Sequence, residues 1–190
     1  MAEREATAAR DALGSTRWLG VAAILLGTAA VLWVLLRLFE FRGALFAFEL
    51  HFTLMATASL LDKLLAPDLQ SPYFDVSERE VRVYRSLGVL GFMRGLRAIG
   101  WTAALRDKEV FDGTRATLAS YERATRHGEH AHTWIFVCVL APIGWAAAHG
   151  WWDAVFWLGS MNVLFHAYPV MLQRFQRARL RHLIALAGPR

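Results

Sequence analysis

The sequence contains a single cysteine, Cys138, and no stretch that would separate domains. One thiol cannot form a disulfide within the chain, and it does not reveal the redox compartment. No internal repeat, low-complexity tract or flexible linker interrupts the 190 residues, which predicts one integral membrane domain over residues 1–190. The first 17 residues mix both signs of charge and lack a basic region before a short apolar core. A cleaved signal peptide is therefore not expected.

Recognisable nucleic-acid-binding modules are also missing, although the formal net charge is +5 and the isoelectric point is about 10.0. The composition is instead unusually apolar, because 56% of the residues are hydrophobic and eight are tryptophan. Nucleic acid is therefore set aside as a partner, and a membrane is the expected environment.

Four apolar runs are close to the ~20 residues that a helix needs to cross a bilayer. They begin at Trp18, Gly43, His132 and Trp152, and the second and fourth carry polar residues inside them. The sequence therefore predicts an all-α, multi-pass protein with about four transmembrane helices. Two further elements complete this fold class, an amphipathic cytoplasmic segment and a basic C-terminal helix.

Positive charge is distributed unevenly around these runs. Lys and Arg are frequent in segment 62–131 and after the fourth run, whereas the connection 146–153 has none. Basic segments favour the cytoplasmic side, so we expect both termini in the cytoplasm of a protein in the cell (inner) membrane. Arg37 and Arg42, near the first external turn, run against this rule.

Segment 62–131 has room for structure outside the bilayer. Pro67 and Pro72 indicate a turn, and Ser77 is a typical helix cap. Residues 84–101 alternate apolar and arginine side chains with the period of an amphipathic helix lying on the inner leaflet, although three glycines weaken the pattern. Residues 111–134 are expected to run as helix directly into the third span.

The basic tail is expected to continue the fourth helix. Leu172, Gln176, Arg179 and Leu183 then share one stripe, so Arg179 is expected to face a partner inside the protein or an anionic ligand. A salt bridge from Arg179 to Glu129 is the structural alternative. The other arginines of this helix fall on the opposite side, where they would reach water and lipid headgroups; they are Arg174, Arg177 and Arg181.

Glu129 and His132 are three residues apart and are therefore neighbours on one helix face. A carboxylate beside an imidazole can fix its tautomer and raise its basicity, as a general base requires. A histidine with a purely interfacial role is the alternative.

These two segments resemble the glycosyl-4,4'-diaponeurosporenoate acyltransferases of staphyloxanthin-type carotenoid synthesis. The matching stretches are "TRHGEHAHTW", with Glu129 and His132, and "AYPVMLQRFQRARL". From the second stretch the resemblance also carries over Pro169, Gln173, Arg174, Arg177, Arg179 and Leu180. Departures from the family pattern are Phe175, Gln176 and Ala178, and the tryptophan after His132 is displaced to Trp134.

The resemblance implies a membrane-bound O-acyltransferase. It would move a fatty acyl group from a thioester of coenzyme A or acyl carrier protein to a hydroxyl of a membrane lipid or glycolipid, such as a glycosylated carotenoid. His132 would be the general base and Glu129 its orienting partner. Donor or acceptor would be bound by Gln173, Arg174, Gln176, Arg177 and Arg179. No metal and no tightly bound cofactor is implied.

Glu49 and Asn162 complete the candidate substrate-binding residues. An ionisable group at the centre of a membrane helix costs about 2.5–3.5 kcal/mol, which makes Glu49 a functional candidate. The alternative is a carboxyl group that joins two helices through Asn162 or His166.

Two other classes of function stay open. Five histidines together with Glu49 and Glu129 could bind haem or a metal, although a second Glu-x-x-His motif is missing; the histidines are His51, His127, His130, His132 and His166. A non-catalytic accessory subunit of a membrane complex is the third class.

Overall fold

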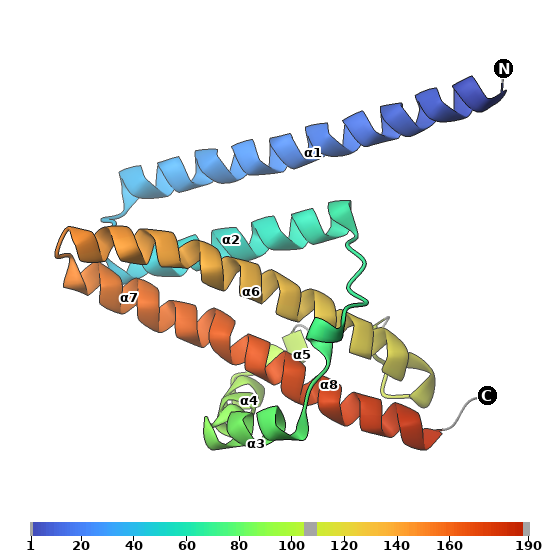
Figure 1. The fold of residues 1–190 in the computed structure, drawn as a ribbon. Coiled ribbons are helices and arrows are strands. Elements are labelled where there is room, and N and C mark those ends of the chain that lie inside the picture. The colour runs from blue at the N-terminus through green and yellow to red at the C-terminus, as the bar shows by residue number, and fades with distance from the viewer. Residues whose placement is uncertain (1, 105–109, 188–190) are drawn as a thin grey trace. The chain divides into compact units, whose positions relative to one another are not determined.

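The computed structural model describes residues 2–104 and 110–187, and every regular element in these ranges is a helix (Figure 1). Four helices are long and apolar enough to cross a membrane, and they span Ser15–Leu38, Ala44–Leu65, Arg115–Ala148 and Trp152–Leu186. The predicted all-α class with four candidate spans is confirmed.

The chain divides into two compact units, each of which is described by itself. Unit 1 comprises Met1–Pro67 and Cys138–Met161, and unit 2 comprises Asp68–Val137 and Asn162–Arg190. The single domain expected from the absence of a linker stays a prediction.

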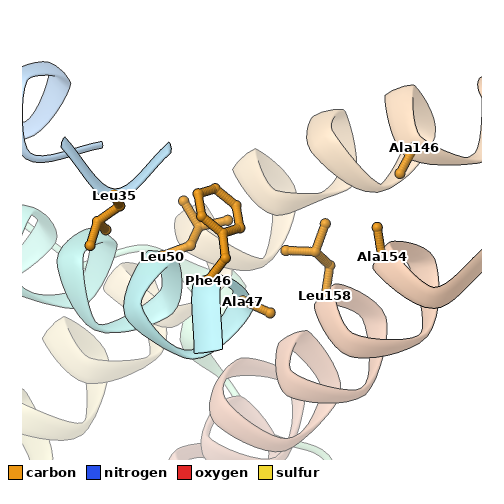
Figure 2. Packing of buried hydrophobic residues seen from close by; sticks show 7 residues of the cluster. All are labelled: Leu35, Phe46, Ala47, Leu50, Ala146, Ala154 and Leu158. Carbon is orange, nitrogen blue, oxygen red and sulfur yellow. The ribbon is translucent and has the colours of Figure 1, made fainter. Parts of the chain in front are cut away.

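Unit 1 contains α1 (Ala2–Leu38), α2 (Ala44–Leu65), the end of α6 (Leu118–Ala148) and most of α7 (Trp152–Asn162). Helices α1 and α2 lie side by side and run in opposite directions (Figure 1). Figure 2 shows the buried apolar cluster of this unit, which contains alanines beside larger side chains; its members are Leu35, Phe46, Ala47, Leu50, Ala146, Ala154 and Leu158. Such packing is suited to helices in lipid, where small residues allow close approach.

The turn after α1 is joined to the start of α7. The Arg42 Nε donates to both carboxylate oxygens of Asp153 at 2.9 Å, and a second guanidinium nitrogen lies 2.8 Å from Asp153 Oδ2. Arg42 is therefore neutralised by a partner in the same unit.

Unit 2 is built around α8 (Tyr168–Ala187), which follows α7 through a π-helical turn, η3 (Val163–Ala167). The remaining elements of this unit are η1 (Pro72–Phe74), α3 (Glu78–Ser86), α4 (Val89–Ala98), α5 (Trp101–Ala104), η2 (Arg115–Thr117) and the first part of α6. The continuation beyond the fourth span is confirmed as helix, and the one into the third span is confirmed from Arg115 on, whereas residues 111–114 are not helical.

The amphipathic segment forms two helices instead of the single one predicted. Ser77 and Glu80 make a capping box at the start of α3, and Gly88 separates α3 from α4 with a φ of 82°. This left-handed conformation suits glycine, which has no Cβ to clash. The apolar sides of α3 and α4 pack against Leu172 and Phe175 of α8. Both short helices contact α8, whose position is labelled in Figure 1.

Candidate functional site

Glu129 is the centre of a buried ion-pair cluster in unit 2. Its carboxylate is fully buried on α6, where Oε1 accepts a hydrogen bond from Arg174 Nη1 at 2.6 Å and Oε2 accepts one from Arg177 Nη2 at 2.5 Å. A buried carboxylate is costly unless it is paired in this way. Both of its oxygens are therefore committed to α8.

The same two arginines hold the segment that precedes α3. Arg174 donates to the carbonyl oxygens of Tyr73 and Asp75 at 3.1 and 3.0 Å, and its Nη2 also reaches Glu80 Oε1 at 2.7 Å. Arg177, which is fully buried, donates to the Phe74 carbonyl at 2.8 Å. Backbone carbonyls of an irregular segment are thus satisfied by guanidinium groups, which offer several donors in a fixed geometry.

A second set of ion pairs extends the cluster. Arg181 contacts Asp75 through Nη1, and its Nε donates to Glu122 Oε1 at 3.1 Å. Glu122 is also bound by Arg126, whose Nη1 donates to the Leu69 carbonyl at 3.0 Å. Segment 69–80, α6 and α8 are therefore linked by one continuous network.

Two carboxylates of this network, Glu80 and Asp75, have pKa values below their usual range. Partial burial would raise the pKa of Glu80, but hydrogen bonds from the Ser77 backbone N–H and the Arg174 guanidinium outweigh it and lower that pKa to about 2. A hydrogen bond from Arg181 likewise lowers the pKa of Asp75. Both groups carry negative charge at neutral pH.

His132 on α6 faces His166, which the sequence indicated only as a haem or metal ligand or as a partner of Glu49. The Nδ1 atoms of His132 and His166 are 3.1 Å apart, and their ring centroids are 5.3 Å apart. His166 is fully buried within η3. Because π-helical turns inside α-helices are uncommon and occur frequently at functional sites, this placement marks the pair as a candidate site.

Two buried oxygen atoms belong to residues close in sequence to the histidine pair, Thr133 on α6 and Asn162 at the end of α7. Asn162 directly precedes η3, and its Nδ2 donates to the Phe136 carbonyl at 3.1 Å. Its Oδ1 and the hydroxyl of Thr133 have no hydrogen-bond partner within the described ranges. Unsatisfied buried oxygens are rare in native proteins and are suited to a bound water or a substrate hydroxyl.

The expected pair of Glu129 and His132 is not formed in the part of the chain that the structure describes. Both oxygens of Glu129 bind arginines, and His132 pairs with His166. Both residues lie on α6, as predicted. The spacing of three residues could not show that Glu129 faces α8 and that His132 faces η3. Their roles in chemistry stay predictions.

The expected orientation of α8 is wrong. Arg177 is fully buried and the side chain of Arg174 is 11% exposed, whereas Arg179 is exposed to solvent. The apolar neighbours of Arg179 on the helix surface do not mark the inward face of α8. The inward face instead carries the arginines, because carboxylates on α3 and α6 and carbonyls of segment 73–75 neutralise them. The alternative bridge from Arg179 to Glu129 is excluded by the partners of Glu129.

The two glutamines of α8 contact α6. Gln176 Oε1 accepts a hydrogen bond from the Tyr121 hydroxyl at 2.9 Å. Gln173 packs against Gly128, where an added Cβ would lie 2.8 Å from Gln173 Nε2. Gly128 therefore permits the close approach of the two helices, and neither glutamine is placed by these contacts in an open binding site.

Glu49 lies half-buried on α2 in unit 1, whereas Asn162 and His166 belong to unit 2. Its role in substrate binding stays a prediction. Among the described residues, no group of three or more His, Cys, Asp or Glu side chains could hold a metal ion.

Sequence reasoning missed His166 as a partner of His132, and Glu80, Asp75 and Glu122 as partners of the arginines. One signal was present. Glu122 and Glu129 are seven residues apart and share a face of α6, as Arg174, Arg177 and Arg181 share a face of α8. Opposite charges on two long helices predict that these faces meet.

The model of one protein family, described as glycosyl-4,4'-diaponeurosporenoate acyltransferase, matches residues 70–186, which is more than half of the chain. The matched range contains the ion-pair cluster and the histidine pair. No curated protein and no solved structure matches the chain at a significant level.

Proposed function

Because this chain belongs to the glycosyl-4,4'-diaponeurosporenoate acyltransferase family, we propose that it transfers a fatty acyl group from a thioester to a hydroxyl of a membrane-embedded lipid or glycolipid. The family match supports a membrane acyltransferase of carotenoid biosynthesis, and the four apolar helices are in keeping with it. A glycosylated carotenoid is one acceptor of this class.

The observation that carries the proposal is the contact between His132 and His166. A hydrogen bond between two Nδ1 atoms at 3.1 Å requires one ring to donate from Nδ1 and the other to accept there. When His132 donates, its Nε2 keeps a lone pair and can act as a base. His166 then takes the orienting role that carboxylates have in other catalytic histidine pairs.

The reaction follows from this tautomer. The acceptor hydroxyl gives its proton to Nε2 of His132 while its oxygen attacks the carbonyl carbon of the thioester. The C–S bond breaks and the acyl group stays on the oxygen as an ester. The thiolate leaves with the proton held by His132, which returns the imidazole to its starting state.

The ion-pair cluster has a positioning role in this account. Glu129 lies about one helical turn before His132 on α6, and Arg174 lies about two turns after His166 on α8. The bonds from Glu129 to Arg174 and Arg177 therefore fix the register in which the two histidines meet. Arg174 and Arg177 thus act through helix packing, and Gln173 and Gln176 contribute to the same contact.

The donor and acceptor would reach the site from different sides. We propose that the protein lies in the inner membrane, with its basic segments and both termini in the cytoplasm. A thioester of coenzyme A or acyl carrier protein would then reach the site from the cytoplasm. An apolar acceptor would enter between helices from the lipid phase. This reaction needs no tightly bound cofactor.

Lipid mass spectrometry of cells that make a hydroxylated lipid acceptor tests the proposal. Membranes with the wild-type protein should contain a lipid heavier by one acyl group, and membranes with His132→Ala should lack it, because the base is removed. His130→Ala is the matched control, since His130 lies two residues away on α6 and hydrogen-bonds Trp134 instead.

Equal amounts of each protein in the membrane are required for the comparison. An acylated lipid that His132→Ala produces as well as wild type would exclude His132 as the base. Identical lipidomes with and without the wild-type protein, in the presence of acceptor, would support an accessory subunit instead.

A further inference from the structure

A shallow groove lies between α3 and α8 in unit 2. It has a volume of about 370 Å³ and is lined by Val81 of α3 and by Ala178, Arg179, His182 and Leu183 of α8. Arg85 extends the same junction, since its guanidinium group lies 5.7 Å from the ring centre of Phe175. The groove thus combines an apolar floor with cationic side chains at its rim.

The rim arginines differ from the other arginines of α8 in their partners. Arg174, Arg177 and Arg181 are each bound to carboxylates. Arg179 and Arg85 are exposed, and neither takes part in an ion pair within the described parts of the chain. Their charge is therefore available to an anionic ligand, and arginine is well suited to bind phosphate with two parallel hydrogen bonds.

The α8 residues of the groove and His166 lie on one continuous helical stretch formed by η3 and α8. From His166 to Arg179 the chain advances 13 residues, which corresponds to about 20 Å at the rise of an α-helix. The pantetheine arm and pyrophosphate of coenzyme A, when extended, cover a comparable length. A phosphate held at the groove would leave such an arm long enough to bring a thioester to His132.

We propose that the groove formed by Val81, Ala178, Arg179, His182 and Leu183, with Arg85 at its edge, binds the phosphate groups of a coenzyme A thioester. The apolar floor would contact the less polar parts of the same donor. This inference rests on the proposed acyl transfer for its biological meaning, but the binding of coenzyme A can be measured without any reaction.

Calorimetry with free coenzyme A tests the groove directly, using the full chain in nanodiscs of phosphatidylcholine, which carries no net charge. We expect Arg179→Gln and Arg85→Gln each to raise the Kd about tenfold, because each removes a charge-assisted hydrogen bond. Ala178→Leu should also weaken binding by filling the floor without changing the charge. Higher salt should weaken binding to the wild type more than to Arg179→Gln.

Arg94→Gln is the matched control, since Arg94 is an exposed arginine of α4 outside the groove lining. Equal Kd values for Arg179→Gln and Arg94→Gln would overturn the inference. Absence of coenzyme A binding to the wild type, or transfer that runs only from acyl carrier protein, would overturn it as well. A requirement for anionic lipid in the disc, with no effect of coenzyme A, would assign the groove to lipid headgroups instead.

The binding experiment can fail or succeed independently of the acyl-transfer experiment. Binding of coenzyme A that Arg179→Gln weakens would support the groove even if no acylated lipid forms. Acyl transfer that depends on His132, together with a Kd insensitive to Arg179 and Arg85, would leave the reaction standing and remove the groove as the donor site.

Discussion

At the scale of single residues, the fully buried carboxylate of Glu129 is bound by two guanidinium groups, and it is the one carboxylate that pairs with Arg177 among the described residues. Arg177 is fully buried, and besides this carboxylate it is bound by the hydroxyl and carbonyl oxygens of Thr125 and by a backbone carbonyl of segment 73–75. Removal of the carboxylate would leave a buried positive charge without its counter-ion. Such uncompensated charges are more costly than the loss of an ion pair at a surface.

We therefore expect Glu129→Gln to lower the free energy of unfolding by about 3–5 kcal/mol. Equilibrium unfolding in detergent, followed by tryptophan fluorescence, provides the measurement. Glu78→Gln serves as control because Glu78 is exposed in the first turn of α3. If both variants were equally stable, the ion-pair cluster would not hold α6 and α8 together.

At the scale of elements, α3 is attached to α8 by contacts that depend on the charge of Glu80. The pKa of Glu80 is lowered to about 2 in the folded protein, whereas an unperturbed glutamate has a pKa of about 4.3. A lowered pKa stabilises the folded state fully above the unfolded value, and this contribution is lost as the pH falls through the folded value. The lowered pKa of Asp75 acts in the same direction.

Glu80→Gln should therefore destabilise the protein at pH 7 and have progressively less effect as the pH falls from about 5 toward 2. The melting temperatures of wild type and variant, measured across this range, should converge at the acidic end. Glu78→Gln should show no such convergence, because Glu78 makes no ion pair in the described chain. A constant difference between wild type and Glu80→Gln at all pH values would contradict the assignment.

Helix positions could be predicted from the sequence because apolar runs and capping residues act locally. Ser77 predicted the start of α3, and the polar lead into the third span predicted the long α6. The break at Gly88 and the π-helical turn depend on packing and were not predictable from periodicity. The side of α8 that faces the protein was predicted wrongly for Arg174, Arg177 and Arg179. It is determined by carboxylates far away in sequence, such as Glu80, which is 94 residues from Arg174.

At the scale of the whole molecule, each unit contains its own ion pairs. In unit 1 Arg42 is bound to Asp153, and in unit 2 Arg174, Arg177 and Arg181 are bound to Glu80, Glu129 and Asp75. The reaction proposed above takes an anionic donor from the aqueous phase and an apolar acceptor from lipid, and the basic residues of unit 2 are suited to the donor.

The candidate site is only partly visible in the sequence. The spacing of Glu129 and His132 and the family resemblance predict His132 as the base, a role that stays a prediction, and they do not indicate the contact with His166. His166 lies 34 residues from His132, and only the crossing of α6 with η3 brings the two rings together. Such pairings between helices depend on tertiary structure, whereas the positions of the long helices follow from the local pattern of apolar residues.

The most direct test of the account is the rate of ester formation by the purified protein in nanodiscs with the acceptor identified in cells. Wild type should form one ester for each thiol released. His132→Ala should lose about 100-fold or more, as expected for removal of a general base. His166→Asn, which keeps a hydrogen-bonding group near the position of Nδ1, should retain more activity than His166→Phe, with the KM values for both substrates unchanged.

This order of rates, in variants that melt like wild type, is the result that the account predicts. Equal rates for His166→Asn and His166→Phe would remove His166 as a positioning residue. Full activity of a folded His132→Ala protein would contradict the central claim that His132 takes the proton from the acceptor hydroxyl.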